Sequence, residues 1–171
     1  MKNKPQTGFT LIELIIVIVI LGILAVTAVP RFIDISTDAN IAILSDMRGK
    51  VDSAAQLVFA KSVIQGIEKS SSAFVDINGD GNGDIRVRYG YPASSSDGII
   101  EALGLNVNSA DSGWAWAARQ AGDMYFSPAK LSEGSGDQGH YSNLQLNCRI
   151  IYYHPNAAGD THRLTGLMTT C

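Results

Sequence analysis

The sequence predicts an α+β fold in which one long N-terminal helix packs against a C-terminal antiparallel β-sheet. Three observations support this fold class. An apolar run, Phe9 to Val29, stands just behind a short basic leader. Helical spacing of apolar residues continues directly after this run, with no cluster of turn residues between them. From about residue 70 onward, alternating apolar patterns and turn-rich segments replace the helical pattern.

The apolar run contains one charged residue, Glu13. As a helix the run would span roughly 30 Å, which matches the hydrocarbon core of a bilayer. A carboxylate costs on the order of 2.5–3.5 kcal/mol near the centre of a membrane and less near its edge. We therefore expect Glu13 to have a specific use. Lys2 and Lys4 in the leader favour a cytoplasmic N-terminus.

Pro30 ends the apolar run, and a proline at this position would kink the helix or free a backbone carbonyl. Helical periodicity nevertheless resumes at once. The apolar residues that form one stripe are Leu44, Met47, Val51, Ala54 and Val58. Gly66 provides a C-terminal stop. The pattern predicts a single helix of roughly 55 residues, apolar all round in its first half and amphipathic in its second.

The remaining residues predict a compact domain built mostly of strands. The expected strands cover Ala73 to Ile77, Ile85 to Tyr89, Trp114 to Trp116, Met124 to Phe126, Leu144 to Tyr153 and Arg163 to Met168. A short helix is expected around Ile99 to Leu105, and loops at Gly134 to Gly139 and Asn156 to Asp160. Pairing of the last two strands would bring Cys171 near Cys148.

Charge and motif content exclude several classes of function. The formal net charge is -3 and the chain has no cluster of Lys and Arg, which argues against binding to nucleic acid. His140, His154 and His162 lack the spacing of a metal site. Asp160 stands near His162, but no G-x-S-x-G motif accompanies the two. We therefore expect surface histidines and no enzymatic activity.

One segment has the ligand pattern of a calcium loop. The residues at positions 1, 3, 5, 7 and 9 of an EF-hand-like loop are Asp76, Asn78, Asp80, Asn82 and Asp84. Gly81 stands at position 6, where a sharp turn is needed, but position 12 is Val87 instead of the usual bidentate Glu. The alternative is a β-hairpin whose Asn-Gly and Asp-Gly pairs supply turn chemistry. Ca²⁺ is thus a candidate ligand, and no cofactor is required.

The two cysteines, Cys148 and Cys171, predict one disulfide if the chain is exported. A bridge between them would contribute roughly 3 kcal/mol in the chain-entropy model. Two free thiols would fit a cytosolic protein, and the apolar run argues against that compartment.

The leader, Gly8, Phe9 and Glu13 together resemble the processing site and first helix of a type IV prepilin. The resemblance implies that a prepilin peptidase cleaves between Gly8 and Phe9 and methylates the new N-terminal Phe9. It divides the chain into a leader (1–8), a transmembrane and filament-core half-helix (9–29), an amphipathic half-helix (30–66) and a globular α+β head (67–171), the type IV pilin fold. A secretory signal peptide would have a shorter apolar core followed by a cleavage site of small residues, and a permanent anchor would leave Glu13 without a purpose.

The opening Met1 to Gly8, the segment Tyr89-Gly90-Tyr91-Pro92 and the late cysteine pair resemble the mannose-sensitive haemagglutinin pilins, a type IVa group of Gram-negative bacteria. This resemblance implies a structural subunit that polymerises into an extracellular filament for surface attachment and biofilm formation. Assembly would use Glu13, Gly22 and Pro30.

The implied partners are identical subunits, the prepilin peptidase and an assembly platform in the inner membrane, with surface glycans as candidate adhesion ligands. The subunit would span the inner membrane once before assembly and become extracellular in the pilus. Two alternatives belong to other classes of protein. One is a pseudopilin of a type II secretion system, which usually lacks the terminal disulfide. The other is a membrane-anchored periplasmic binding protein, which would give no role to Phe9 and Glu13.

Overall fold

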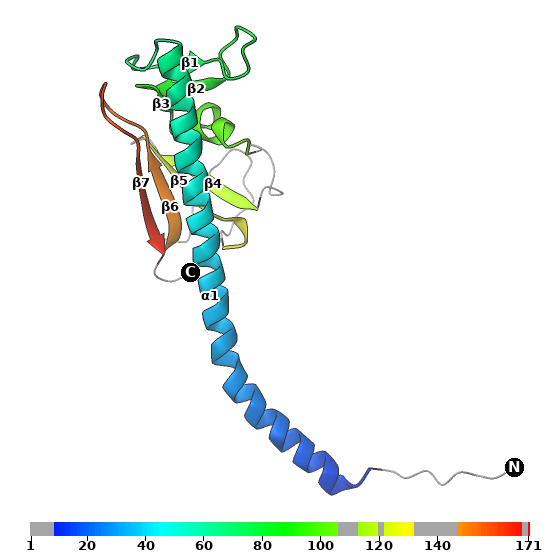
Figure 1. The fold of residues 1–171 in the computed structure, drawn as a ribbon. Helices are drawn as coiled ribbons and strands as arrows, with labels where there is room; N and C mark the ends of the chain where they lie inside the picture. The colour runs from blue at the N-terminus through cyan, green and yellow to red at the C-terminus, as the bar shows by residue number, and fades with distance from the viewer. Residues whose placement is uncertain (1–8, 106–112, 120–121, 132–146, 169–170) are drawn as a thin grey trace, which may run out of the picture. The chain divides into compact units, whose positions relative to one another are not determined.

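The computed structural model describes residues 9–105, 113–119, 122–131, 147–168 and 171, with backbone alone at 28–34 and 119. Figure 1 shows the elements, whose order is α1 (Leu11–Ile64), β1 (Ala73–Val75), β2 (Ile85–Arg88), β3 (Tyr91–Pro92), η1 (Ser96–Ile100), β4 (Trp114–Arg119), β5 (Asp123–Pro128), η3 (Ala129–Leu131), β6 (Cys148–Tyr153) and β7 (Arg163–Met168). The chain forms two compact units, Met1–Asp38 and Ala39–Cys171, which we call the N-terminal and C-terminal units. The α+β fold class is confirmed.

Helix α1 runs unbroken for 54 residues, as the sequence predicts. At its end, Gly66 adopts a left-handed conformation with φ 70°. The Gly66 N–H donates to the carbonyl of Val63, and the Ile67 N–H donates to the carbonyl of Ser62. These two bonds form a Schellman motif, which satisfies carbonyls that the end of the helix would otherwise leave free. The predicted stop at Gly66 is confirmed.

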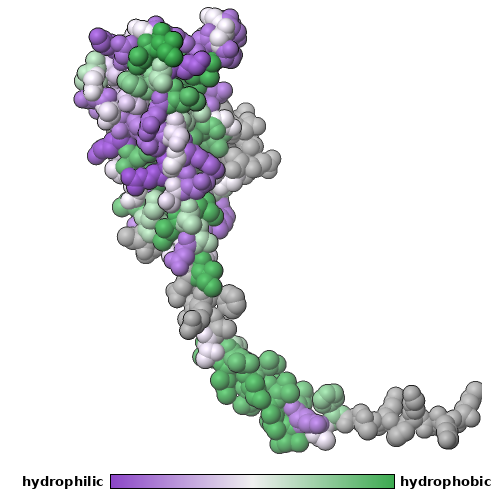
Figure 2. Space-filling model, viewed as in Figure 1, coloured by the Kyte–Doolittle hydropathy of each residue, from purple (hydrophilic) through white to green (hydrophobic). Residues whose placement is uncertain are grey.

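In the C-terminal unit, one face of α1 is buried. Its buried apolar residues are Leu44, Met47, Val51, Ala55 and Val58. The sequence pattern had placed Ala54 on this stripe, which is wrong because Ala54 is only half-buried and Ala55, four residues after Val51, takes the core position. Across the face shown in Figure 2, hydrophilic residues cover much of the C-terminal unit.

The first sheet has the strand order β1-β2-β3, with all neighbours antiparallel. Val75 pairs with Ile85, so the polar segment 76–84 connects β1 and β2 as a hairpin loop. The expected strands are therefore confirmed, although each ends one or two residues earlier than predicted. β3 was not predicted, because it holds only two residues and one is a proline.

The second sheet is a meander of four antiparallel strands, β4-β5-β6-β7. One face packs with α1 in a single core cluster, to which Trp116, Phe126 and Tyr152 contribute. The predicted pairing of the last two strands is confirmed, with Cys148 opposite Met168. The predicted strand positions 144–146 and the predicted loop 134–139 lie outside the described residues. The sequence predicts one sheet, whereas the described residues form two.

Candidate assembly site

The first turn of α1 is held by Thr10 and Glu13. The Thr10 N–H and hydroxyl both donate to Oε2 of Glu13, each at 2.8 Å, and the Glu13 N–H lies 3.4 Å from the Thr10 hydroxyl oxygen. This reciprocal arrangement is a capping box, which satisfies donors that the start of a helix leaves free. The carboxylate of Glu13 is thus directed back toward the start of the helix in the single chain.

The helix beyond this cap is apolar on every side. All described side chains from residue 9 to residue 27 are exposed, including Phe9 at 92 % and Leu11 at 76 %. On the face that Figure 2 draws, this segment is mostly hydrophobic, with a small hydrophilic patch near its start. An exposed apolar surface of this extent marks a site of interaction with protein or lipid. Within the described residues, no helix combines the length and the hydropathy needed to cross a membrane.

The structure describes the other residues predicted for processing and assembly only in part. Gly8 lies outside the described residues. Gly22 lies in α1, and a Cβ added there would meet no atom within 4 Å. Pro30 lies within the bounds of α1, but its side chain is outside the described ones. The roles of Gly22 and Pro30 stay predictions.

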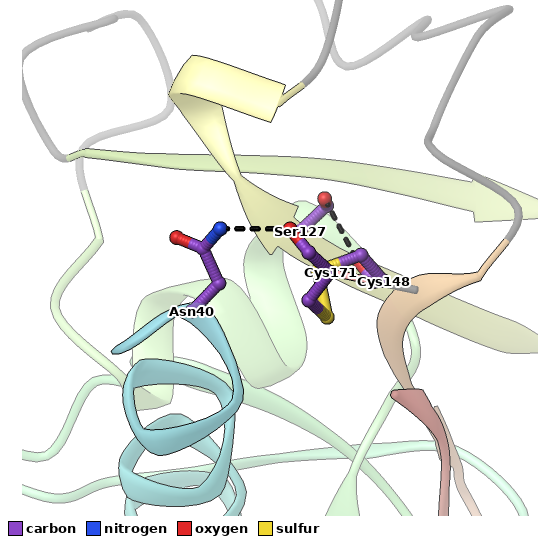
Figure 3. The surroundings of a disulfide bond; sticks show 4 residues. All are labelled: Asn40, Ser127, Cys148 and Cys171. Atoms are coloured by element: carbon purple, nitrogen blue, oxygen red, sulfur yellow. Dashed lines mark hydrogen bonds between the residues drawn. A yellow bond between two sulfur atoms is a disulfide. The ribbon is translucent and has the colours of Figure 1, made fainter. Parts of the chain in front are cut away.

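The predicted disulfide is present. Cys148 and Cys171 are joined, with their Cα atoms 5.0 Å apart, and Cys148 is buried. Figure 3 shows that two polar side chains surround this bond. Nδ2 of Asn40 donates to the main-chain oxygen of Cys171 at 2.8 Å, and the Ser127 hydroxyl donates to the carbonyl of Cys148 at 2.9 Å. Sequence reasoning missed Asn40, although it stands four residues before Leu44 on the buried stripe.

In the hairpin loop, Asp76 binds the backbone of its own loop. Its carboxylate accepts hydrogen bonds from the N–H groups of Gly79 at 2.6 Å and Gly81 at 2.8 Å. The N–H groups of Gly81 and Gly79 lower the pKa of the Asp76 carboxyl. At the other end of the loop, Asp84 accepts from the N–H of Ile77 at 2.9 Å.

The middle of the loop repeats this pattern. The Asp80 N–H donates to the side chain of Asn78 and the Asn82 N–H donates to the side chain of Asp80, both at 2.8 Å. Local bonds of this kind stabilise turns without a metal. The described residues contain no group of three or more His, Cys, Asp or Glu side chains arranged to hold a metal ion. A calcium site here stays a prediction.

The expectation of surface histidines is wrong for His154 and His162, while His140 lies outside the described residues. His154 is 8 % exposed, and its Nδ1 accepts a hydrogen bond from the Ser94 N–H at 3.1 Å. Burial, followed by the nearby charge of Arg88, lowers the pKa of His154. Both histidines bind residues far away in sequence, so no local pattern could reveal their burial.

His162 lies beside α1, where its Nε2 is 2.8 Å from Oδ1 of Asp52. Its side chain is 10 % exposed, and its ring lies 4.9 Å from the ring of Tyr91, centroid to centroid. His162 and Asp52 line a groove of about 860 Å³ on the C-terminal unit. Sequence reasoning had considered Asp160 as the neighbour of His162, but the carboxylate that binds the ring is Asp52.

Comparison with known proteins links the N-terminal segment to a recognised motif. The family model of the prokaryotic N-terminal methylation motif matches residues 3–29. The chain is 43 % identical over 72 residues to the type IV narrow pilus major component PilA5 of Thermus thermophilus, which covers 42 % of this chain and 60 % of PilA5. This chain therefore spans less than two thirds of that relative. No solved structure matches significantly.

Two other relatives match over a larger share of their length. The type IV major fimbrial protein FimA of Dichelobacter nodosus is 28 % identical over 117 residues, which cover 60 % of this chain and 73 % of FimA. A fimbrial protein of Pseudomonas aeruginosa is 31 % identical over 126 residues, which cover 64 % of this chain and 76 % of that protein. Together with the methylation motif and the helix-on-sheet fold, these matches show that the chain belongs to the type IV pilins.

Proposed function

We propose that this pilin is a structural subunit of a type IV pilus and polymerises through the N-terminal part of α1. The observation that carries the proposal is the all-round exposure of the apolar side chains from residue 9 to residue 27. Such a surface is stable in lipid or in contact with other copies of the same helix. A helical filament packs the helices of many subunits together and so provides this contact. The relatives named as pilus or fimbrial proteins support it. The pseudopilin and binding-protein alternatives are less well supported.

Processing precedes assembly in this proposal. A prepilin peptidase cleaves between Gly8 and Phe9 and methylates the new amine of Phe9. The methylation motif at residues 3–29 supports this step. Before cleavage, the apolar run anchors the subunit in the inner membrane, and Lys2 and Lys4 keep the leader in the cytoplasm.

During assembly, Glu13 pairs the subunit with its neighbour in the filament. Cleavage creates an ammonium group on Phe9, and the carboxylate of Glu13 in a neighbouring subunit neutralises it inside the apolar filament core. Removing one member of a buried ion pair typically costs on the order of 3–5 kcal/mol. The capping box supports this role, because within the described residues Glu13 is bound to Thr10 alone and these bonds are exposed.

Extension and attachment complete the proposal. In the filament, α1 opens between Gly22 and Pro30, because glycine lowers helix propensity and proline lacks an N–H donor. The assembly platform of the inner membrane extends the fibre outward. The resemblance to the haemagglutinin pilins supports a Gram-negative host, surface attachment with glycans as candidate ligands, and biofilm formation.

The proposal is tested on surface fibres. Electron microscopy should show fibres on cells that carry the gene and none on cells that lack it. Mass spectrometry of the purified fibres should find a chain that begins with methylated Phe9. Fibres in the absence of the gene, or a subunit that begins at Met1, would contradict the proposal.

A further inference from the structure

We propose that Asn40 and the Cys148–Cys171 disulfide form a clamp that stops local unfolding of α1 from spreading into the C-terminal unit. The clamp joins three parts of that unit. Asn40 lies on α1, Cys148 begins β6, and Cys171 is bound to both (Figure 3). The inference goes beyond filament formation, because it concerns the single subunit and can be tested whether or not fibres form.

Burial along α1 changes at Asn40. From residue 9 to residue 39, every described side chain of the chain is exposed or half-buried. Asn40 is 2 % exposed and begins the buried stripe that continues with Leu44 and Met47. A helical segment without tertiary packing opens at low free-energy cost, because isolated helices are marginally stable in water. The boundary between easily opened and protected helix should therefore lie at this residue.

The residue that accepts the hydrogen bond from Asn40 is itself held in place by the disulfide. The acceptor is the main-chain oxygen of Cys171, which the disulfide ties to β6. β6 is itself hydrogen-bonded between β5 and β7, and the Ser127 hydroxyl on β5 adds a bond to the carbonyl of Cys148. Asn40 therefore binds a residue that the disulfide links covalently to the second sheet.

A polar residue at this position is unfavourable for packing alone. Oδ1 of Asn40 is buried and has no hydrogen-bond partner among the described residues. A buried acceptor without a partner destabilises the folded state, and the hydrogen bond from Nδ2 must offset this cost for Asn40 to hold the helix. What the amide adds is a directional bond, and a single buried Asn is known to fix the register of packed helices. The hydrogen bond from Asn40 to Cys171 therefore holds the turn of α1 at which the buried stripe begins.

Hydrogen exchange resolved to single amides tests this inference, with the full chain in detergent micelles. In Asn40→Leu, which replaces the amide with an apolar side chain of similar size and so removes the donor, the amides of residues 41–47 should exchange at least tenfold faster. Amides from Val51 onward, and those of β5 and β6, should keep their rates. Asn40→Ala, if it folds, should show the same faster exchange at the amides of residues 41–47.

Ser62→Ala is the matched control. Ser62 is the buried polar residue near the other end of the same stripe, and its hydroxyl donates within the helix to the carbonyl of Val58 at 2.9 Å. This variant should leave the exchange of residues 41–47 unchanged. Unchanged exchange at these amides in Asn40→Leu would overturn the clamp. So would an equal acceleration across β5 and β6, because Asn40 would then act on global stability alone.

Discussion

His162 lies in contact with Asp52 across a sequence separation of 110 residues, with Nε2 of the ring 2.8 Å from Oδ1 of the carboxylate. The pair joins α1 to the residue just before β7, and the histidine ring also packs near Tyr91 and Tyr152. It is therefore a tertiary contact between the helix and the edge of the second sheet.

Removing this contact should destabilise the C-terminal unit. Asp52→Ala leaves the nearly buried ring of His162 without its hydrogen-bond partner, and we expect a loss of about 1 kcal/mol in the free energy of unfolding. Urea denaturation measures the change. The control is Asp46→Ala, which breaks the exposed ion pair with Lys50 within one helix and should cost at most about 0.5 kcal/mol. Equal stability of Asp52→Ala and the unmodified chain would show that the contact contributes nothing.

The buried His154 should make stability depend on pH. Because burial lowers its pKa in the folded state below the ordinary 6.5, the unfolded chain binds more protons between the two values. The stabilising contribution is complete above about pH 6.5 and is lost as the pH falls toward the lowered pKa. His154→Asn keeps an acceptor for the Ser94 N–H but does not titrate there. The difference in melting temperature between the two chains should change between pH 7.5 and pH 5, and a constant difference would contradict the prediction.

The turn between β2 and β3 is strained at one residue. Tyr89 has a φ of 48°, and Gly90 follows with a φ of 83°. Positive φ at both positions is the geometry of a type I′ hairpin turn, for which Asn-Gly is preferred. Tyr89→Asn should therefore stabilise the C-terminal unit by about 1 kcal/mol. Tyr89→Ala, which keeps the unfavourable φ, is the control and should bring no gain; equal stabilisation by both variants would refute the argument from strain.

The loop at 76–84 provides a test for calcium. If its three aspartates bind Ca²⁺ without a ligand at position 12, affinity should be weak, in the range of roughly 10⁻⁴–10⁻³ M. Millimolar calcium should then raise the melting temperature relative to chelator, because the ion binds only the folded chain. Asp80→Ala should abolish the rise, and Asp160→Ala, which removes an exposed acid outside the loop, should not. Identical melting curves with calcium and with chelator would show that the loop is a hairpin turn that binds no calcium.

The sequence predicts those parts of the fold that depend on local patterns. The length of α1 follows from continuous helical spacing, and its end follows from Gly66. The pairing of β6 with β7 follows from two adjacent alternating segments, and it places Cys148 within reach of Cys171. The capping box of Thr10 and Glu13 is equally local, but it was not predicted.

Other features depend on contacts between distant residues, which single-sequence patterns do not contain. β3 exists because Val87 and Arg88 pair with a dipeptide that has no strand pattern of its own. The burial of His154 depends on Ser94, and the importance of Asn40 depends on where Cys171 lies. A polar residue on an otherwise apolar stripe was the one available signal for Asn40.

Counting surface fibres on cells that produce Glu13→Ala tests the central claim most directly. Loss of the carboxylate should leave the subunit folded, disulfide-bonded and inserted in the membrane, but largely absent from fibres. Glu101→Ala, which removes an exposed carboxylate next to η1, should give fibres in normal number. The account predicts few or no fibres for Glu13→Ala at a normal subunit level, and fibres in normal number would contradict it.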